Sequence, residues 1–201
     1  MKTVFACLLL PMLLVTPSFS QTTSPTGAAA VFLGDSMLYG FANFPEYIPG
    51  GVVNLAVTTS KSSGVVQTVN TAVQHNPRTI FIMTGINDIA DGDLSGFTRN
   101  YNTILDTIAV KSPGSKVYVQ ALLPVNWTAF PRAYDFDNGA VNSYNSAISG
   151  VAASHANATY LDFRPYFTDA SGNLKAELSK DGLHLNSDGY KIWGGLMSRY
   201  F

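Results

Sequence analysis

Short apolar runs that alternate with longer segments of helical period constrain this chain more than any other feature of its sequence. The runs that predict strands are 29–33, 52–57, 79–84, 116–122 and 159–163. Between and after them, apolar side chains recur every three or four residues, as in Phe97, Tyr101, Ile104, Leu105 and Ile108. That spacing is typical of the buried face of a helix. Strands that alternate with helices predict a parallel sheet covered on both faces.

The predicted fold class is therefore α/β, a three-layer α/β/α sandwich built on a doubly wound parallel sheet of about five strands. A chain of 201 residues, 46% of them hydrophobic, suits one domain with a substantial core. In such a sheet, ligands bind outside the carboxyl ends of the strands. Residues that carry chemistry are expected directly after strands.

The first 20 residues have the pattern of a secretory signal peptide. Lys2 precedes an apolar run at 4–15, and positions 18–20 supply a small-x-small cleavage pattern. The run is too short to span a bilayer, which takes about 20 apolar residues. The alternative is an N-terminal membrane anchor that is never cleaved.

Cleavage after residue 20 leaves a flexible leader at 21–27, with the sequence QTTSPTG, and one folded domain at 28–201. The mature protein is then expected to be secreted or periplasmic, with no stable membrane anchor.

Charge and cysteine content exclude several classes of function. The chain has 12 Lys and Arg against 13 Asp and Glu, without a basic cluster, so nucleic acid is not an expected partner. The one cysteine, Cys7, lies in the predicted signal peptide. The mature chain would then contain no disulfide, no Cys-ligated zinc and no Cys nucleophile. The acids Asp88, Asp91 and Asp93 lack calcium-loop spacing and predict a solvated loop.

Two short motifs follow the first and third predicted strands. In LGDSMLYG, Ser36 stands at a predicted helix start, where free N–H groups and the helix dipole favour developing negative charge. For an isolated Gly-Asp-Ser, a simple helix N-cap is the commoner interpretation of the serine. In TGINDIADGD, Asn87 has an amide that could donate to an oxyanion, although an Asx turn explains a lone Asn as well.

A third motif, KDGLHLN, follows the fifth predicted strand. Asp181 can hold one ring nitrogen of His184 and leave the other free, with Gly182 letting the chain fold back. A surface turn produces the same spacing. The three motifs together supply a nucleophile, a base, an orienting acid and an oxyanion donor, which is the set that acyl transfer needs.

These blocks, GDS at 34–36, GIND at 85–88 and DGLHLN at 181–186, resemble those of the SGNH, or GDSL-type, hydrolase family of esterases and lipases. The chain is most similar to small single-domain members related to platelet-activating factor acetylhydrolase and sialate O-acetylesterases. The resemblance implies a flavodoxin-like core without metal or cofactor. It also implies a serine acetylesterase that hydrolyses short acyl esters of carbohydrates or other small alcohols, and the signal-peptide pattern predicts that this enzyme is secreted.

The resemblance also assigns roles to residues. It implies Ser36 as nucleophile, His184 as general base and then acid, and Asp181 as orienting acid. The oxyanion hole would comprise the Ser36 N–H, the Asn87 amide and the Ala56 N–H. Where the family usually has Asn-x-Gly and a second glycine three residues later, this chain reads NLAVTTS, with Ala56 and then Thr59 at those places.

The longest irregular stretch, 124–138, follows the fourth predicted strand. The candidates for substrate recognition in this stretch are Trp127, Phe130, Arg132 and Tyr134. One interpretation is that they form a wall that recognises a sugar or alcohol. The other is that they only cover the edge of the sheet.

The expected partner is a small-molecule ester. Three other functions stay open: a lysophospholipase- or thioesterase-type hydrolase, an O-acetyltransferase, and an inactive carbohydrate-binding homologue. The sequence leaves the oligomeric state open.

Overall fold

The computed structural model describes residues 27–41, 45–47 and 50–201. The predicted signal peptide and nearly all of the predicted leader lie outside the described residues. The strands are β1 (Ala30–Gly34), β2 (Val52–Asn54), β3 (Thr79–Met83), β4 (Lys116–Gln120) and β5 (Ala158–Leu161). They form one sheet in the order β2-β1-β3-β4-β5, with every pair parallel. The predicted doubly wound sheet is confirmed.

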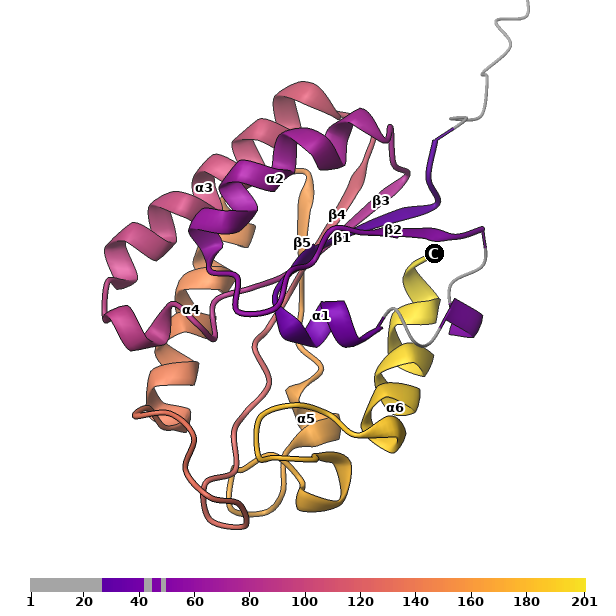
Figure 1. Cartoon of the computed structure of the whole chain (residues 1–201). Helices are drawn as coiled ribbons and strands as arrows, with labels where there is room; N and C mark the ends of the chain where they lie inside the picture. Colours follow the sequence, from indigo (N-terminus) through magenta and orange to yellow (C-terminus); the bar gives the residue numbers. More distant parts are fainter. Residues whose placement is uncertain (1–26, 42–44, 48–49) are drawn as a thin grey trace, which may run out of the picture.

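Helices cover both faces of this sheet. They are α1 (Ser36–Gly40), α2 (Ser62–Gln74), α3 (Leu94–Lys111), α4 (Asn138–Ala153), α5 (Arg164–Phe167) and α6 (Ser187–Met197). Short 3-10 turns are η2 (Pro45–Tyr47), η3 (Ile89–Asp91), η4 (Ala176–Leu178) and η5 (Ser198–Tyr200). Figure 1 shows α2, α3 and α4 on one face and α1 and α6 on the other. The predicted three-layer arrangement is confirmed.

The apolar periodicity places the core as predicted. Every residue of β1 and β3 is buried, because helices pack on both faces of these strands. The α3 stripe from Phe97 to Ile108 is buried, whereas Val110 of the same helix is 79% exposed. One face of α3 therefore packs on the sheet and the other meets solvent.

The second strand is shorter than predicted, because β2 ends at Asn54 rather than at Val57. The Asn54 side chain accepts a hydrogen bond from the Ala56 N–H at 3.0 Å and donates one to the Leu38 carbonyl at 2.8 Å. This Asx interaction turns the chain out of the sheet. Val57 is consequently 52% exposed.

The last helix, α6, packs against α1 and holds the C-terminal segment beside it. Trp193 of α6 is fully buried and donates from Nε1 to Gln120 Oε1 at 2.6 Å. Tyr190 donates from its hydroxyl to the Met37 carbonyl at 3.0 Å. The Trp193 ring also packs edge-on against Phe41, with centroids 5.3 Å apart. These contacts bring the segment before α6 beside the start of α1 (Figure 1).

A cavity of about 740 Å³ lies at the amino edge of the sheet, where the strands begin. Arg78, Lys116 and residues 198–201 line it, and the Phe201 ring lies 5.0 Å from that of Phe81. None of the predicted site residues is there. None of the helices in the described ranges has the length and apolar character needed to cross a membrane.

Candidate active site

Ser36 is the first residue of α1, and a single residue, Asp35, separates it from the end of β1. The N-cap of α1 is Asp35, whose Oδ1 accepts the Met37 N–H at 3.1 Å. The N-cap alternative considered for Ser36 is therefore wrong. Because Asp35 does the capping, the Ser36 hydroxyl is available to another partner, and its Oγ lies 2.9 Å from Nε2 of His184.

The turn at 181–184 places a carboxylate behind this imidazole. Asp181 Oδ2 lies 2.7 Å from Nδ1 of His184. Asp181 Oδ1 accepts the backbone N–H groups of His184, at 2.7 Å, and Leu183, at 3.0 Å. With Nδ1–H directed at the carboxylate, Nε2 is left to accept the Ser36 proton. The structure thus brings Ser36, His184 and Asp181 into one hydrogen-bonded chain.

The Asp181 carboxylate is suited to remain charged. Partial burial disfavours its ionised form, but the hydrogen bonds from His184 and Leu183 outweigh burial and lower the pKa of Asp181 below its usual value. A persistent negative charge at this position stabilises an imidazolium form of His184.

Gly182 makes this turn possible. Its φ is +86°, in the left-handed region that glycine tolerates. A Cβ at this position would lie 2.6 Å from the Asn126 carbonyl oxygen and 3.2 Å from Cζ3 of Trp127. The Gly182 carbonyl also accepts the Asn126 N–H at 2.8 Å. The turn is therefore packed tightly against the segment that follows β4.

Asn87 lies after β3 and supports the loop between β2 and α2. Its Nδ2 donates to the Ser60 carbonyl at 2.9 Å, which uses one of its two amide hydrogens. The neighbouring Asp88 accepts from the Ser62 N–H at 2.9 Å and from the Ser62 hydroxyl at 2.5 Å, so it caps α2 from another element. The Val57 N–H bonds the Gly34 carbonyl at 3.0 Å. The loop is fixed beside the end of β1.

The structure argues against the expected third oxyanion donor. The Ala56 N–H is already donated to Asn54 Oδ1 at 3.0 Å. The left-handed residue of this loop is Thr59, with φ +62°, in a turn closed by the Ser60 N–H and the Val57 carbonyl at 3.1 Å. A β-branched residue in this region is a genuine outlier. We therefore replace Ala56 by Thr59 as the candidate backbone donor.

The four side chains predicted to recognise substrate divide into two groups. Trp127 and Phe130 lie against the turn at 181–184, which we call the catalytic turn after its proposed role. Both have an atom within 3.2 Å of the place that a Cβ on Gly182 would occupy. Arg132 lines a polar cavity next to Trp127. Tyr134 stacks on Phe136 at 5.5 Å and 30°, packing within its own loop. A role for these residues in substrate binding stays a prediction.

Asp35 is a titratable group that the sequence interpretation left out. It is fully buried, and its Oδ2 has no hydrogen-bond partner in the described part of the chain. Burial raises the pKa of Asp35 from 3.8 to about 7. The available signal was its place immediately before Ser36 at a predicted helix start, because aspartate is a preferred N-cap residue.

Comparisons with known proteins agree with this geometry. The GDSL-like Lipase/Acylhydrolase family matches residues 32–192. A multidomain esterase of Ruminococcus flavefaciens is 27% identical over 124 residues, which are 60% of this chain and 15% of that protein. The chain spans at most half of the length of the curated relatives it matches.

Solved structures give the same fold. A GDSL-like lipase from Bacteroides thetaiotaomicron superposes with a TM-score of 0.72 at 20% identity, covering 85% of each chain. A carbohydrate esterase family 3 protein from Talaromyces cellulolyticus superposes with a TM-score of 0.62 at 18% identity, covering 86% of this chain and 95% of the other.

A parallel α/β sandwich with a serine, a histidine and an aspartate joined at its carboxyl edge is an arrangement typical of serine hydrolases. The chain belongs to the GDSL-like lipase/acylhydrolase family, and this membership places it among the carboxylic ester hydrolases. The family predicted from the sequence motifs is confirmed.

Proposed function

We propose that this protein is a secreted serine esterase that hydrolyses short acyl esters, acetyl above all, of carbohydrates or other small alcohols. The observation that carries the proposal is the hydrogen-bonded chain from Ser36 Oγ through His184 to Asp181, with distances of 2.9 Å and 2.7 Å. A hydroxyl becomes a competent nucleophile when an oriented imidazole takes its proton.

In the proposed reaction, Ser36 Oγ attacks the ester carbonyl while His184 Nε2 takes the hydroxyl proton. The carbonyl oxygen becomes an oxyanion, which the Ser36 N–H, the second Asn87 amide hydrogen and the Thr59 N–H stabilise. His184 then protonates the leaving alcohol. Water, activated by the same imidazole, releases the acid and restores Ser36. Asp181 keeps its charge and holds the imidazole throughout.

Short acyl groups and carbohydrate esters are favoured for two reasons. The first is the resemblance of the sequence motifs to those of small single-domain SGNH members, which favours short acyl groups over long acyl chains. Relatives and structural neighbours include the multidomain esterase and the carbohydrate esterase named above. The secreted location rests on the signal-peptide pattern of residues 1–20.

Hydrolysis of p-nitrophenyl acetate tests the proposal. We expect Ser36→Ala to lower the rate on the order of 1000-fold or more, because no other group replaces Oγ. Ser63→Ala is the matched control, since Ser63 is an exposed helical serine and its loss should leave the rate unchanged. Equal rates for wild type and Ser36→Ala would overturn the esterase proposal.

A second measurement distinguishes transfer from hydrolysis. Wild-type protein is given p-nitrophenyl acetate with and without a sugar acceptor in excess, and free acetate is measured beside nitrophenol. Equal release of acetate and nitrophenol in both conditions supports hydrolysis. Acetylated sugar in place of acetate would instead indicate an O-acetyltransferase.

A further inference from the structure

Two adjoining cavities lie beside the catalytic turn, on the side of the segment that follows β4. The first, about 540 Å³, is lined by Trp127, Arg132, Asn138, Asn142 and Asn173, among others. The second, about 340 Å³, shares Asn138 and Asn142 with the first and adds Arg164, the first residue of α5. Both volumes lie within the range of about 300–1000 Å³ that is common for small-ligand sites. We call the two cavities together the polar groove, after the Asn138 and Asn142 side chains that line both.

We propose that the polar groove binds a neutral oligosaccharide, the chain that carries the ester cleaved at Ser36. This inference rests on the proposed function, because it names the kind of alcohol to which the acyl group is attached. It extends that function with a binding site beyond the reacting atoms.

The polar groove is joined to the catalytic turn by Trp127. One edge of the indole packs on Gly182, with Cζ3 3.2 Å from the Cβ position, and the same residue lines the first cavity. The Trp127 Nε1 donates to the Phe136 carbonyl at 2.8 Å, which fixes the ring plane. A ligand in the groove therefore lies against the same side chain that supports Asp181 and His184.

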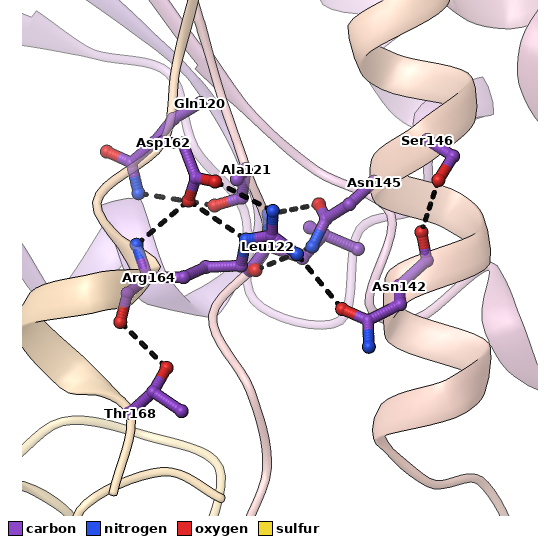
Figure 2. Close-up of polar contacts among 9 residues, drawn as sticks. All are labelled: Gln120, Ala121, Leu122, Asn142, Asn145, Ser146, Asp162, Arg164 and Thr168. Carbon is purple, nitrogen blue, oxygen red and sulfur yellow. Dashed lines mark hydrogen bonds and ion pairs between the residues drawn. The ribbon is translucent and has the colours of Figure 1, made fainter. Parts of the chain in front are cut away.

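The charges in the groove disfavour an anionic ligand. Arg164 donates from Nε and Nη2 to the two carboxylate oxygens of Asp162, at 2.9 Å and 2.7 Å. Figure 2 shows this pair, with Arg164 reaching from α5 toward Asn142 of α4. Arg132 is paired with Asp135 at 3.3 Å. Because both cations already have carboxylate partners, a phosphate or carboxylate would have to compete with them.

The hydrogen-bonding groups of the first cavity also disfavour an acyl chain and suit hydroxyl groups. Asn142 accepts from Arg164 Nη1 at 2.9 Å with its Oδ1, and its Nδ2 has no partner in Figure 2 or elsewhere in the described ranges. Asn173 accepts from Asn138 at 3.1 Å with its Oδ1 and likewise leaves its Nδ2 to a ligand. An acyl chain would bury these amides without hydrogen bonds, which is costly. A sugar offers hydroxyls to the amides and C–H groups to the Trp127 ring.

Calorimetric titration of the Ser36→Ala protein with xylohexaose, cellohexaose and mannohexaose tests the groove directly, because these sugars carry no ester. We expect at least one to bind. Asn142→Ala and Arg132→Ala should each weaken that binding about 5- to 10-fold, by loss of a hydrogen-bonding group. Asn70→Ala is the matched control: Asn70 is an exposed helical asparagine that accepts from Lys111 at 2.6 Å, and its loss should leave binding unchanged.

The outcomes separate the groove from the proposed function. Failure of all three sugars to bind, or equal affinity in Asn142→Ala, Arg132→Ala and Asn70→Ala, overturns the groove even if p-nitrophenyl acetate hydrolysis depends on Ser36. Binding that is lost in the groove variants, without Ser36-dependent hydrolysis, overturns the esterase and leaves a carbohydrate-binding protein.

Discussion

The hydroxyl oxygen of Ser36 lies 2.9 Å from Nε2 of His184, although 148 residues separate them in the chain. Ser36 follows β1, an interior strand between β2 and β3, and His184 precedes α6, which packs on α1 through Tyr190 and Trp193. The packing of the last helix on the first therefore sets the geometry on which the proposed chemistry depends.

Replacing Asp181 by asparagine should impair turnover more than binding. An amide at this position cannot stabilise the imidazolium form of His184, so we expect kcat for p-nitrophenyl acetate to fall on the order of 1000-fold with KM little changed. Asp188→Asn, at an exposed acid of α6, serves as control. Circular dichroism checks that the variant protein is still folded. A loss of only a few-fold in kcat would remove Asp181 from the proposed triad.

Replacing Asp35 by asparagine should stabilise the protein in a pH-dependent way. The pKa of Asp35 is raised from 3.8 to about 7, so the folded state binds the proton more tightly than the unfolded state. The stability contributed by protonated Asp35 is present below pH 3.8 and lost as pH rises through 7. Asparagine keeps the acceptor for the Met37 N–H without the buried charge.

Urea denaturation at pH 4 and pH 8 measures this effect. We expect Asp35→Asn to gain up to about 4 kcal/mol over wild type at pH 8 and little at pH 4. Asp135→Asn, at a fully exposed carboxylate, should show no comparable change. The same gain at both pH values would show that burial of charge is not the cause.

Thr59 offers a test of the backbone donor. Proline fixes φ near −65° and removes the N–H, so Thr59→Pro should lower kcat about 100- to 1000-fold. Thr59→Gly keeps both the N–H and the φ of +62° and should retain full activity. Because Thr59 is exposed, neither variant should unfold the protein, and thermal melting checks this. A Pro variant as active as the Gly variant would exclude Thr59 as a donor.

Gly182→Ala should destabilise the catalytic turn. The added Cβ would stand 2.6 Å from the Asn126 carbonyl oxygen at a φ of +86°, and clash and backbone strain together should cost about 2 to 4 kcal/mol. Gly92 has a φ of +67° and no atom within 4 Å of its Cβ position, so Gly92→Ala isolates the strain, about 1 kcal/mol. Equal denaturation midpoints for the two variants would contradict the packing described here.

The fold could be predicted because its signals are local and repeated. Buried strands appear in the sequence as short apolar runs. Helices appear as apolar residues every three or four positions, as in α3 from Phe97 to Ile108. The rule that ligands bind at the carboxyl ends of parallel strands then brings the segments with Ser36, Asn87 and His184 to one edge. The structure places Ser36 and His184 in contact there, while the roles of these residues in catalysis stay predictions.

Other features depend on contacts between distant segments, which no local pattern reports. β2 ends early because the Asn54 side chain reaches the Leu38 carbonyl. That same side chain accepts the Ala56 N–H, so the motif pointed to a donor that already has an acceptor within the loop. Asp35 and Ser36 are both good capping residues, and only the geometry shows which one caps α1. The polar groove is lined by stretches that lie far apart in the chain.

The position of Phe201 has a practical consequence. This residue lines the cavity at the amino edge of the sheet, together with the beginnings of the strands, whereas Ser36 lies past the opposite end of β1. A tether appended after Phe201 would consequently attach the molecule to a bead or a scaffold through the amino edge of the sheet. Immobilised in this way, the protein would keep its reactive side turned outward, toward insoluble material in the surrounding liquid.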